Sequence, residues 1–133
     1  MNIADRDRLY CEMRRVLKPG GRLALQEVAA GPGGPPYYPV QWAREPGISF
    51  LLSQAATRST LEAVGFRVIV WQDTTEAALA SAAARARNAG GPPPVLGTHL
   101  IIGNDWQAMF RNSTRNLEGR RTELFNAVLE RAG

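Results

Sequence analysis

The chain has 133 residues, 44% of them hydrophobic, which fits a single domain that buries roughly two thirds of its unfolded surface. One cysteine and one histidine exclude an intrachain disulfide, a cysteine-based zinc site and most paired nucleophile–base or histidine-metal sites. The net charge is +4, but the arginines are interleaved with acidic residues, which favours an ion-paired surface over one that binds nucleic acid.

No stretch reaches the run of about 18 apolar residues that a membrane-spanning helix needs. Charged residues at positions 5–8 also interrupt any apolar leader segment. We therefore expect a cytoplasmic protein.

The first predicted element is a helix over residues 5–17, with Asp5 as its N-cap. Its apolar residues fall on one face of a 3.6-residue period: Leu9, Met13, Val16 and Leu17. Pro19 ends the helix because it lacks an N–H and disfavours helical backbone in the preceding residue. Gly20 suits the centre of a type II turn, where φ is positive. Residues 22–29 then predict a strand buried on much of both faces, as in a parallel sheet.

Residues 30–36 combine glycines with three prolines and predict a turn. The prolines remove N–H donors and no helix follows directly, which argues against a phosphate-binding glycine loop. Two aromatic and apolar stretches, 37–44 and 47–52, lack a clean period and either cover a pocket or pack as irregular core. The candidate polar groups of such a pocket are Tyr38, Trp42 and Ser49.

A second helix is predicted over residues 53–64. Gly65 is well placed to end it as the C′ residue, where a left-handed conformation is common. The following residues, 66–71, are rich in β-branched and aromatic side chains and predict a strand.

Asp73 and Glu76 have the N-cap and N3 spacing of a capping box. They precede an alanine-rich helix predicted over residues 74–88. Glycine and proline at 90–94 predict an internal linker. Residues 96–102 form a short apolar piece that fits either a helix or a strand.

The last part of the chain predicts one clear helix. It begins at Asp105 as its cap and continues to Leu117, with Met109 and Phe110 as apolar anchors. Residues 122–131 fit a helix or a strand by local pattern. No internal repeat is evident.

Two motifs in this order resemble the C-terminal half of a class I S-adenosylmethionine (SAM)-dependent methyltransferase. They are the Lys-Pro-Gly-Gly turn within residues 15–25 and the Leu-x-x-x-Gly-Phe helix end at 61–66. In that family the first motif leads into strand five and the second into strand six. The resemblance implies an α/β fold, the C-terminal part of a Rossmann-like sheet in which strands five, seven and six are adjacent. Residues 122–131 would then be the antiparallel strand seven.

Residues 38–51 and 110–120 further resemble the type 11 and menaquinone-methyltransferase-like subgroup, which acts on small molecules. This resemblance implies SAM as the cofactor of the complete enzyme, with Asn2 near it. It also implies that Tyr38, Trp42 and Ser49 bind the substrate. Aromatic faces can line a dry cavity and attract a sulfonium or amine cation. No general base is identified, and Glu27 and His99 are candidates only because they titrate.

The chain departs from the family in one important respect. It lacks the acidic glycine-rich loop and the ribose-binding acidic residue that hold SAM. We therefore expect residues 1–133 to be one partial methyltransferase domain without its cofactor-binding half, inactive alone, with strands one to four preceding Met1. Residues 22–28 would then expose an unpaired strand edge that invites self-association. The alternative is a non-catalytic module that pairs with another chain or binds nucleic acid through a basic surface.

Overall fold

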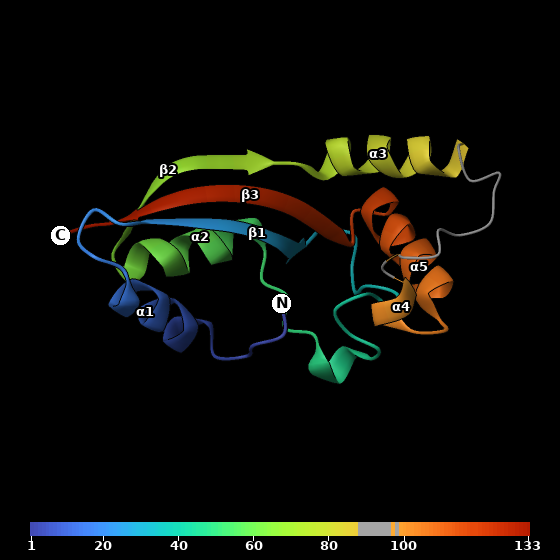
Figure 1. Ribbon diagram of the computed structural model, residues 1–133, viewed down its shortest axis with the longest axis horizontal. Helices are drawn as coiled ribbons and strands as arrows, with labels where there is room; N and C mark the ends of the chain where they lie inside the picture. Colours follow the sequence, from blue (N-terminus) through green and yellow to red (C-terminus); the bar gives the residue numbers. More distant parts are fainter. Residues whose placement is uncertain (88–96, 98) are drawn as a thin grey trace.

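The computed structural model describes residues 1–87, 97 and 99–133, and its centre is a three-stranded sheet (Figure 1). The strands are β1 (Arg22–Ala30), β2 (Phe66–Asp73) and β3 (Thr122–Arg131), in the order β1-β3-β2. β3 pairs antiparallel with both neighbours, so β1 and β2 run parallel to each other. This arrangement confirms the predicted α/β fold and the five-seven-six strand order, and it assigns residues 122–131 to a strand.

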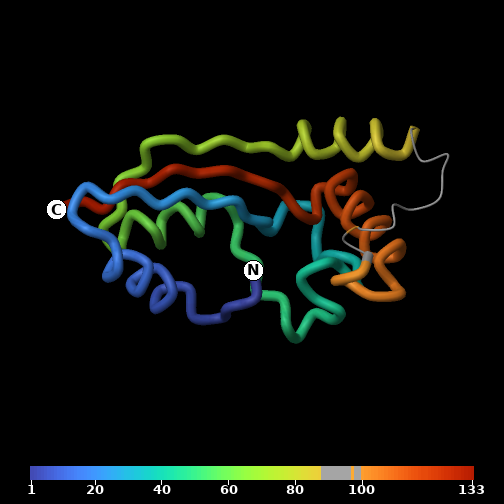
Figure 2. The backbone as a smooth tube through the Cα atoms, viewed as in Figure 1, coloured from blue at the N-terminus to red at the C-terminus, as the bar shows by residue number. Residues whose placement is uncertain are grey.

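Helices lie on one face of the sheet and beyond one of its ends (Figure 1). α1 (Arg6–Val16) and α2 (Gln54–Ala63) cover the face, whereas α3 (Thr75–Arg87), the short α4 (His99–Ile102) and α5 (Trp106–Glu118) lie past the end where β2 stops and β3 starts. The C-terminus lies at the opposite end of the sheet (Figure 2). Within the described chain, no helix has the length and apolar character needed to cross a membrane.

The core lies between the sheet and helices α1 and α2. Phe125 and Leu129 of β3 are fully buried there with Tyr10 of α1 and Leu61 of α2. The indole of Trp71 stacks on Phe125, with the ring centroids 4.5 Å apart. The helices therefore dock on the face of the sheet that carries these side chains.

The opposite face of the sheet is more open, which corrects one expectation for β1. Arg22, Ala24 and Gln26 are exposed, although β1 was expected to be buried on much of both faces. Side chains alternate between the two faces of a strand, and α1 and α2 cover only one of them. β1 is therefore a half-buried strand.

The predicted turn chemistry around β1 and β2 is confirmed. The Asp5 side chain accepts a hydrogen bond from the Arg8 N–H at 2.9 Å and caps α1. Gly20 has φ 72° within a turn closed by the Gly21 N–H and the Lys18 carbonyl at 2.8 Å. Gly65 has φ 95° just after α2. Each glycine holds a left-handed conformation that side chains with a Cβ rarely adopt.

The predicted caps of α3 and α5 differ from the expected pattern. Asp73 accepts a hydrogen bond from the Thr75 N–H at 2.8 Å, while the Glu76 carboxylate turns to Arg120 at 3.0 Å, so no capping box exists. Asp105 precedes α5 without a side-chain cap bond because its carboxylate pairs with Arg44. Tertiary ion pairs thus compete with local capping at both helix starts.

The structure also shows which secondary structure forms in part of residues 96–102, a segment that fitted either a helix or a strand. The described part of the ambiguous 96–102 segment includes the helix α4. The predicted linker at 90–94 lies outside the described residues.

The outer edge of β1 is open over most of its length. The Gly31 N–H donates to the Arg121 carbonyl, and the Arg131 N–H donates to the Gly21 carbonyl. The backbone N–H and C=O groups of odd-numbered residues in this segment therefore point toward β3. Groups on even-numbered residues therefore point away from β3, because the two sides alternate along an antiparallel strand. Among the outward N–H groups of β1, only that of Ala30 has a backbone partner in the described chain, the Leu52 carbonyl at 2.9 Å.

We expect this edge to drive concentration-dependent self-association, measured by size-exclusion chromatography with light scattering. Ala24→Pro should shift the population toward monomer, because it removes an outward N–H and leaves the β1–β3 ladder intact.

Ala24→Val is the matched control, since it keeps the N–H and should associate as the unmodified chain does. A wild-type chain that stays monomeric at all concentrations and melts cooperatively would contradict the prediction.

Candidate functional site

A cavity of about 520 Å³ lies between α3 and α5 at the end of the sheet. Each helix contributes four lining residues at the spacing i, i+3, i+4, i+7, which places them on one helical face. On α3 they are Ala78, Ser81, Ala82 and Arg85, and on α5 they are Phe110, Ser113, Thr114 and Leu117. The two faces form opposite walls of one cavity whose size suits a small molecule.

The remaining walls come from the sheet and from two loop segments. The sheet provides Val28, Thr122 and Leu124, and the loops provide Met1, Gln41 and Trp42. Among the described residues of the lining, apolar side chains predominate and Arg85 is the only charged side chain. These residues include no carboxylate and no histidine side chain.

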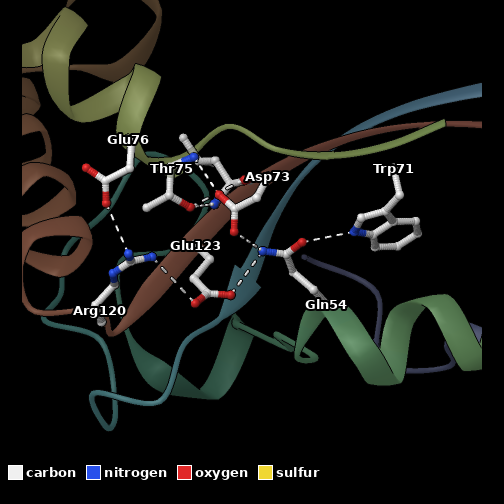
Figure 3. A network of polar contacts seen from close by, with 8 residues as sticks. Gln54, Trp71, Asp73, Thr75, Glu76, Arg120 and Glu123 are labelled. Atoms are coloured by element: carbon white, nitrogen blue, oxygen red, sulfur yellow. Dashed lines mark hydrogen bonds and ion pairs between the residues drawn. The ribbon is translucent and has the colours of Figure 1, made fainter.

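A polar network fixes the start of α3 against the sheet (Figure 3). The Thr75 hydroxyl, fully buried, accepts from the Leu124 N–H at 3.0 Å, and the Thr74 N–H donates to the Leu124 carbonyl at 2.8 Å. Arg120 joins Glu76 of α3 at 3.0 Å. These contacts set the position of the α3 wall relative to Leu124, which itself lines the cavity.

Gln54 is the centre of the same network (Figure 3). Its amide nitrogen donates to Asp73 at 2.7 Å and to Glu123 at 3.0 Å, and its oxygen accepts from the Trp71 indole at 2.9 Å. Burial tends to raise the pKa of Asp73, but hydrogen bonds from Thr75 and Gln54 outweigh it and lower the pKa below 3.8. The network therefore favours a charged Asp73.

α5 holds the segment that carries Trp42 by side-chain hydrogen bonds to alternate residues. Asn116, fully buried, accepts from the Tyr37 N–H at 2.7 Å and donates to the Tyr37 carbonyl at 3.0 Å. Asn112 donates to the Pro39 carbonyl at 2.9 Å, and Ser113 donates to Gln41. This irregular segment obtains from α5 the hydrogen bonds that a neighbouring strand would otherwise supply.

The Tyr37 ring adds a second anchor to this segment. The guanidinium carbons of Arg115 and Arg121 lie 3.7 and 4.3 Å from its ring centroid. An aromatic ring attracts cations toward its faces, so both arginines stabilise its position.

A tight turn presents Trp42 to the cavity. Val40 and Ala43 exchange two backbone hydrogen bonds, at 2.8 and 3.1 Å, around Gln41 and Trp42. The Trp42 indole N–H donates to the Ser49 hydroxyl at 3.0 Å, and the Trp42 carbonyl accepts from the Asn2 amide. Hydrogen bonds thus hold both the indole ring and the backbone carbonyl of Trp42 in place.

Hydrogen bonds link three of the four predicted site residues, and the fourth, Tyr38, shares a second cavity with Ser49. Asn2, Trp42 and Ser49 are linked by hydrogen bonds, and Trp42 lines the main cavity. Tyr38 and Ser49 line a second cavity of about 320 Å³. The Asn2 amide donates to two backbone carbonyls, those of Trp42 and Ile48. The cofactor and substrate roles of these residues remain predictions.

Most of the cavity wall was missed by sequence reasoning. The α3 face consists of two alanines, a serine and an arginine. Residues of these types are typical of a solvent-exposed helix. On α5, Phe110 was expected to be an apolar anchor, and it lines the cavity instead of joining the central core. The available signal was the equal i, i+3, i+4, i+7 spacing of small or polar residues on two helices.

The glycine-rich turn after β1 is filled by the chain itself. A Cβ on Gly31 would lie 2.1 Å from the Arg120 carbonyl oxygen, and one on Gly33 would lie 1.9 Å from that of Gly119. The two glycines therefore allow close packing against the turn before β3. Their environment does not match a loop that cradles phosphate or SAM.

Glu27 is held in an ion pair beneath the sheet. Its carboxylate lies 2.6 Å from the buried Arg6 guanidinium, with Tyr10 beside them. Burial, and then the Glu27 charge, raises the pKa of Tyr10. No group of three or more metal-ligating side chains occurs among residues 1–87, 97 and 99–133.

No family model matches the chain, and no curated protein matches it. Solved structures do match its fold. Geranyl diphosphate C-methyltransferase from Streptomyces coelicolor A3(2), solved with S-adenosyl-L-homocysteine, is 15% identical with a TM-score of 0.67, over 99% of this chain and 44% of that chain. Phosphoethanolamine N-methyltransferase 2 from Haemonchus contortus, solved with SAM, is 14% identical with a TM-score of 0.68, over 99% and 31%.

A third similar structure, the [4+2]-cyclase SpnF, is 20% identical with a TM-score of 0.56, over 95% of this chain and 44% of that chain. The chain thus spans less than half the length of these three proteins. At these identities the likeness shows the fold alone, which the chain shares with part of each of these proteins.

We expect Asn116→Ala to destabilise the chain by about 1–3 kcal/mol, because the polar groups of Tyr37 lose their partners. Urea denaturation followed by circular dichroism measures this loss.

Glu118→Ala, at an exposed position of the same helix, is the control and should change stability little. An Asn116→Ala chain as stable as this control would show that the Tyr37 contacts contribute nothing.

Asp73 should make stability depend on pH in the acid range. A group whose pKa is lowered by folding stabilises the fold above its unfolded value and loses that contribution as the pH falls. We expect Asp73→Asn to reduce the free energy of unfolding at neutral pH, and its difference from wild type to shrink below pH 3.8. Urea denaturation across this range measures the difference.

The matched control is Glu45→Gln, whose exposed side chain has no partner in the described chain. An Asp73→Asn difference that stays constant with pH would contradict the assignment.

Proposed function

We propose that this chain is the acceptor-side part of a SAM-dependent methyltransferase, that the complete enzyme methylates a small molecule, and that this chain alone is inactive. The observation that carries the proposal is the cavity between α3 and α5, which lies at one end of a sheet with a methyltransferase fold. A volume of about 520 Å³ suits a small organic acceptor.

The residues of this chain do not fit the cofactor by themselves. The turn containing Gly31 and Gly33 is closed by Gly119 and Arg120, and the lining residues that the structure describes offer no carboxylate for a ribose diol. Asn2 remains the proposed cofactor contact. We propose that the other contacts come from a cofactor-binding half, either on a longer polypeptide or on a second chain that pairs with the open edge of β1.

The proposed contribution of this chain to the reaction is then a mainly apolar cavity wall that positions the acceptor. Methyl transfer requires alignment of the reacting groups and exclusion of water more than proton transfer by the protein. Trp42, fixed by Ser49, is the proposed central substrate contact, with Tyr38 contributing from the second cavity. The described lining residues include no acid and no histidine, so an acceptor that must lose a proton would pass it to water or to the proposed cofactor-binding half.

The alternative, a non-catalytic module, finds its support in the open edge of β1. Binding to nucleic acid has less support because many arginines are already paired with carboxylates. These arginines are Arg6, Arg15, Arg44, Arg58, Arg67 and Arg120. Counterion release needs cations that are free to contact phosphate.

The decisive experiment compares SAM binding by two products using isothermal titration. The first is this chain alone, for which we expect no stoichiometric binding. The second is a product extended by the in-frame genomic sequence upstream of the Met1 codon. We expect it to contain a glycine loop, bind SAM and transfer a labelled methyl group to a small-molecule extract.

Tight stoichiometric binding by the chain alone would contradict its proposed incompleteness. An extended product that folds but binds no SAM would contradict the methyltransferase function. Binding to DNA with a steep salt dependence would instead support the nucleic-acid alternative.

A further inference from the structure

We propose that the cavity binds an amphipathic molecule with an apolar body and an anionic group, a carboxylate or a phosphate, at Arg85. The role of this molecule as methyl acceptor depends on the function proposed above, whereas its binding does not.

Arg85 is the only charged side chain among the described lining residues, and its environment leaves it available to a ligand. Its guanidinium donates to the Ser81 hydroxyl at 3.0 Å on the same helical face. Within the part of the chain that the structure describes, no carboxylate pairs with it. A cation held toward a cavity without carboxylates favours an anion and disfavours an ammonium group.

The apolar side chains of the cavity lie inward from Arg85. Ala78 and Arg85 are two helical turns apart, which places them about 10 Å apart along α3. Ala78 lies three residues after Thr75, which contacts Leu124, so that end of the α3 wall adjoins the sheet. An anion at Arg85 would therefore leave an apolar body between Ala82 and the α5 wall.

The small side chains on α3 leave the space that such a body needs. Ala78 and Ala82 line the cavity from α3, Phe110 and Leu117 line it from α5, and Val28 and Leu124 line it from the sheet. The polar pair Gln41 and Ser113 are hydrogen-bonded to each other. Arg85, on the α3 wall, is the cationic side chain that the described lining offers to a ligand.

Four eight-carbon probes that differ in headgroup test the inference by isothermal titration of the full chain. Octanoate and octyl phosphate should bind more tightly than octanol, and octylamine should bind most weakly. Arg85→Gln should weaken both anions about three- to tenfold, the range of a partly solvated ion pair, and leave octanol unchanged. The ratio of octanoate to octyl phosphate affinity shows which anion the site prefers.

Arg87→Gln is the matched control, because it removes the same charge from an exposed position of α3 outside the lining. Arg85→Lys should keep the preference for anions. Circular dichroism verifies that each variant keeps its fold. The inference is overturned if no probe binds, if octanol or octylamine binds as tightly as octanoate, or if Arg87→Gln weakens the anions as much as Arg85→Gln.

The two proposals can fail separately. Methyl transfer by the extended product without any anion preference would overturn the ligand class alone. An Arg85-dependent preference for anions together with an extended product that binds no SAM would overturn the methyltransferase function alone.

Discussion

The whole structure depends on the pairing of β3 with both of its neighbours. β1 and β2 do not pair with each other, so the sheet exists only because β3 lies between them. The same strand buries Phe125 and Leu129 against the helices and begins with Thr122 at the cavity. Core, sheet and cavity are therefore joined through one segment of the chain.

The sequence predicted features that depend on local chemistry. Pro19, Gly20 and Gly65 marked helix ends correctly because their backbone preferences act over a few residues. The strand character of β3 did not follow from its local pattern and came from the resemblance to a family. Its central place depends on pairing with distant partners, which no local period encodes.

Prediction of the site succeeded only in part for a similar reason. The aromatic segment that contains Trp42 fitted either a pocket cover or irregular core, with Trp42 as a candidate pocket residue, and Trp42 lines a cavity. The α3 wall could not be predicted, because its alanine-rich sequence indicates a helix but does not indicate which part of the protein that helix contacts. Arg85 gains its significance only when α5 lies opposite, and tertiary packing alone determines that.

The position of β3 also has a consequence for the order of events during synthesis. Leu25 of β1 pairs with Ala127, about 100 residues further along the chain. Such distant pairing carries a large entropic cost of loop closure and slows folding. On the ribosome, β1 and β2 emerge before the strand that joins them, so their inner edges stay unpaired for the time needed to translate the segment up to β3. A nascent chain at this stage is a natural client for chaperones that shield exposed strands.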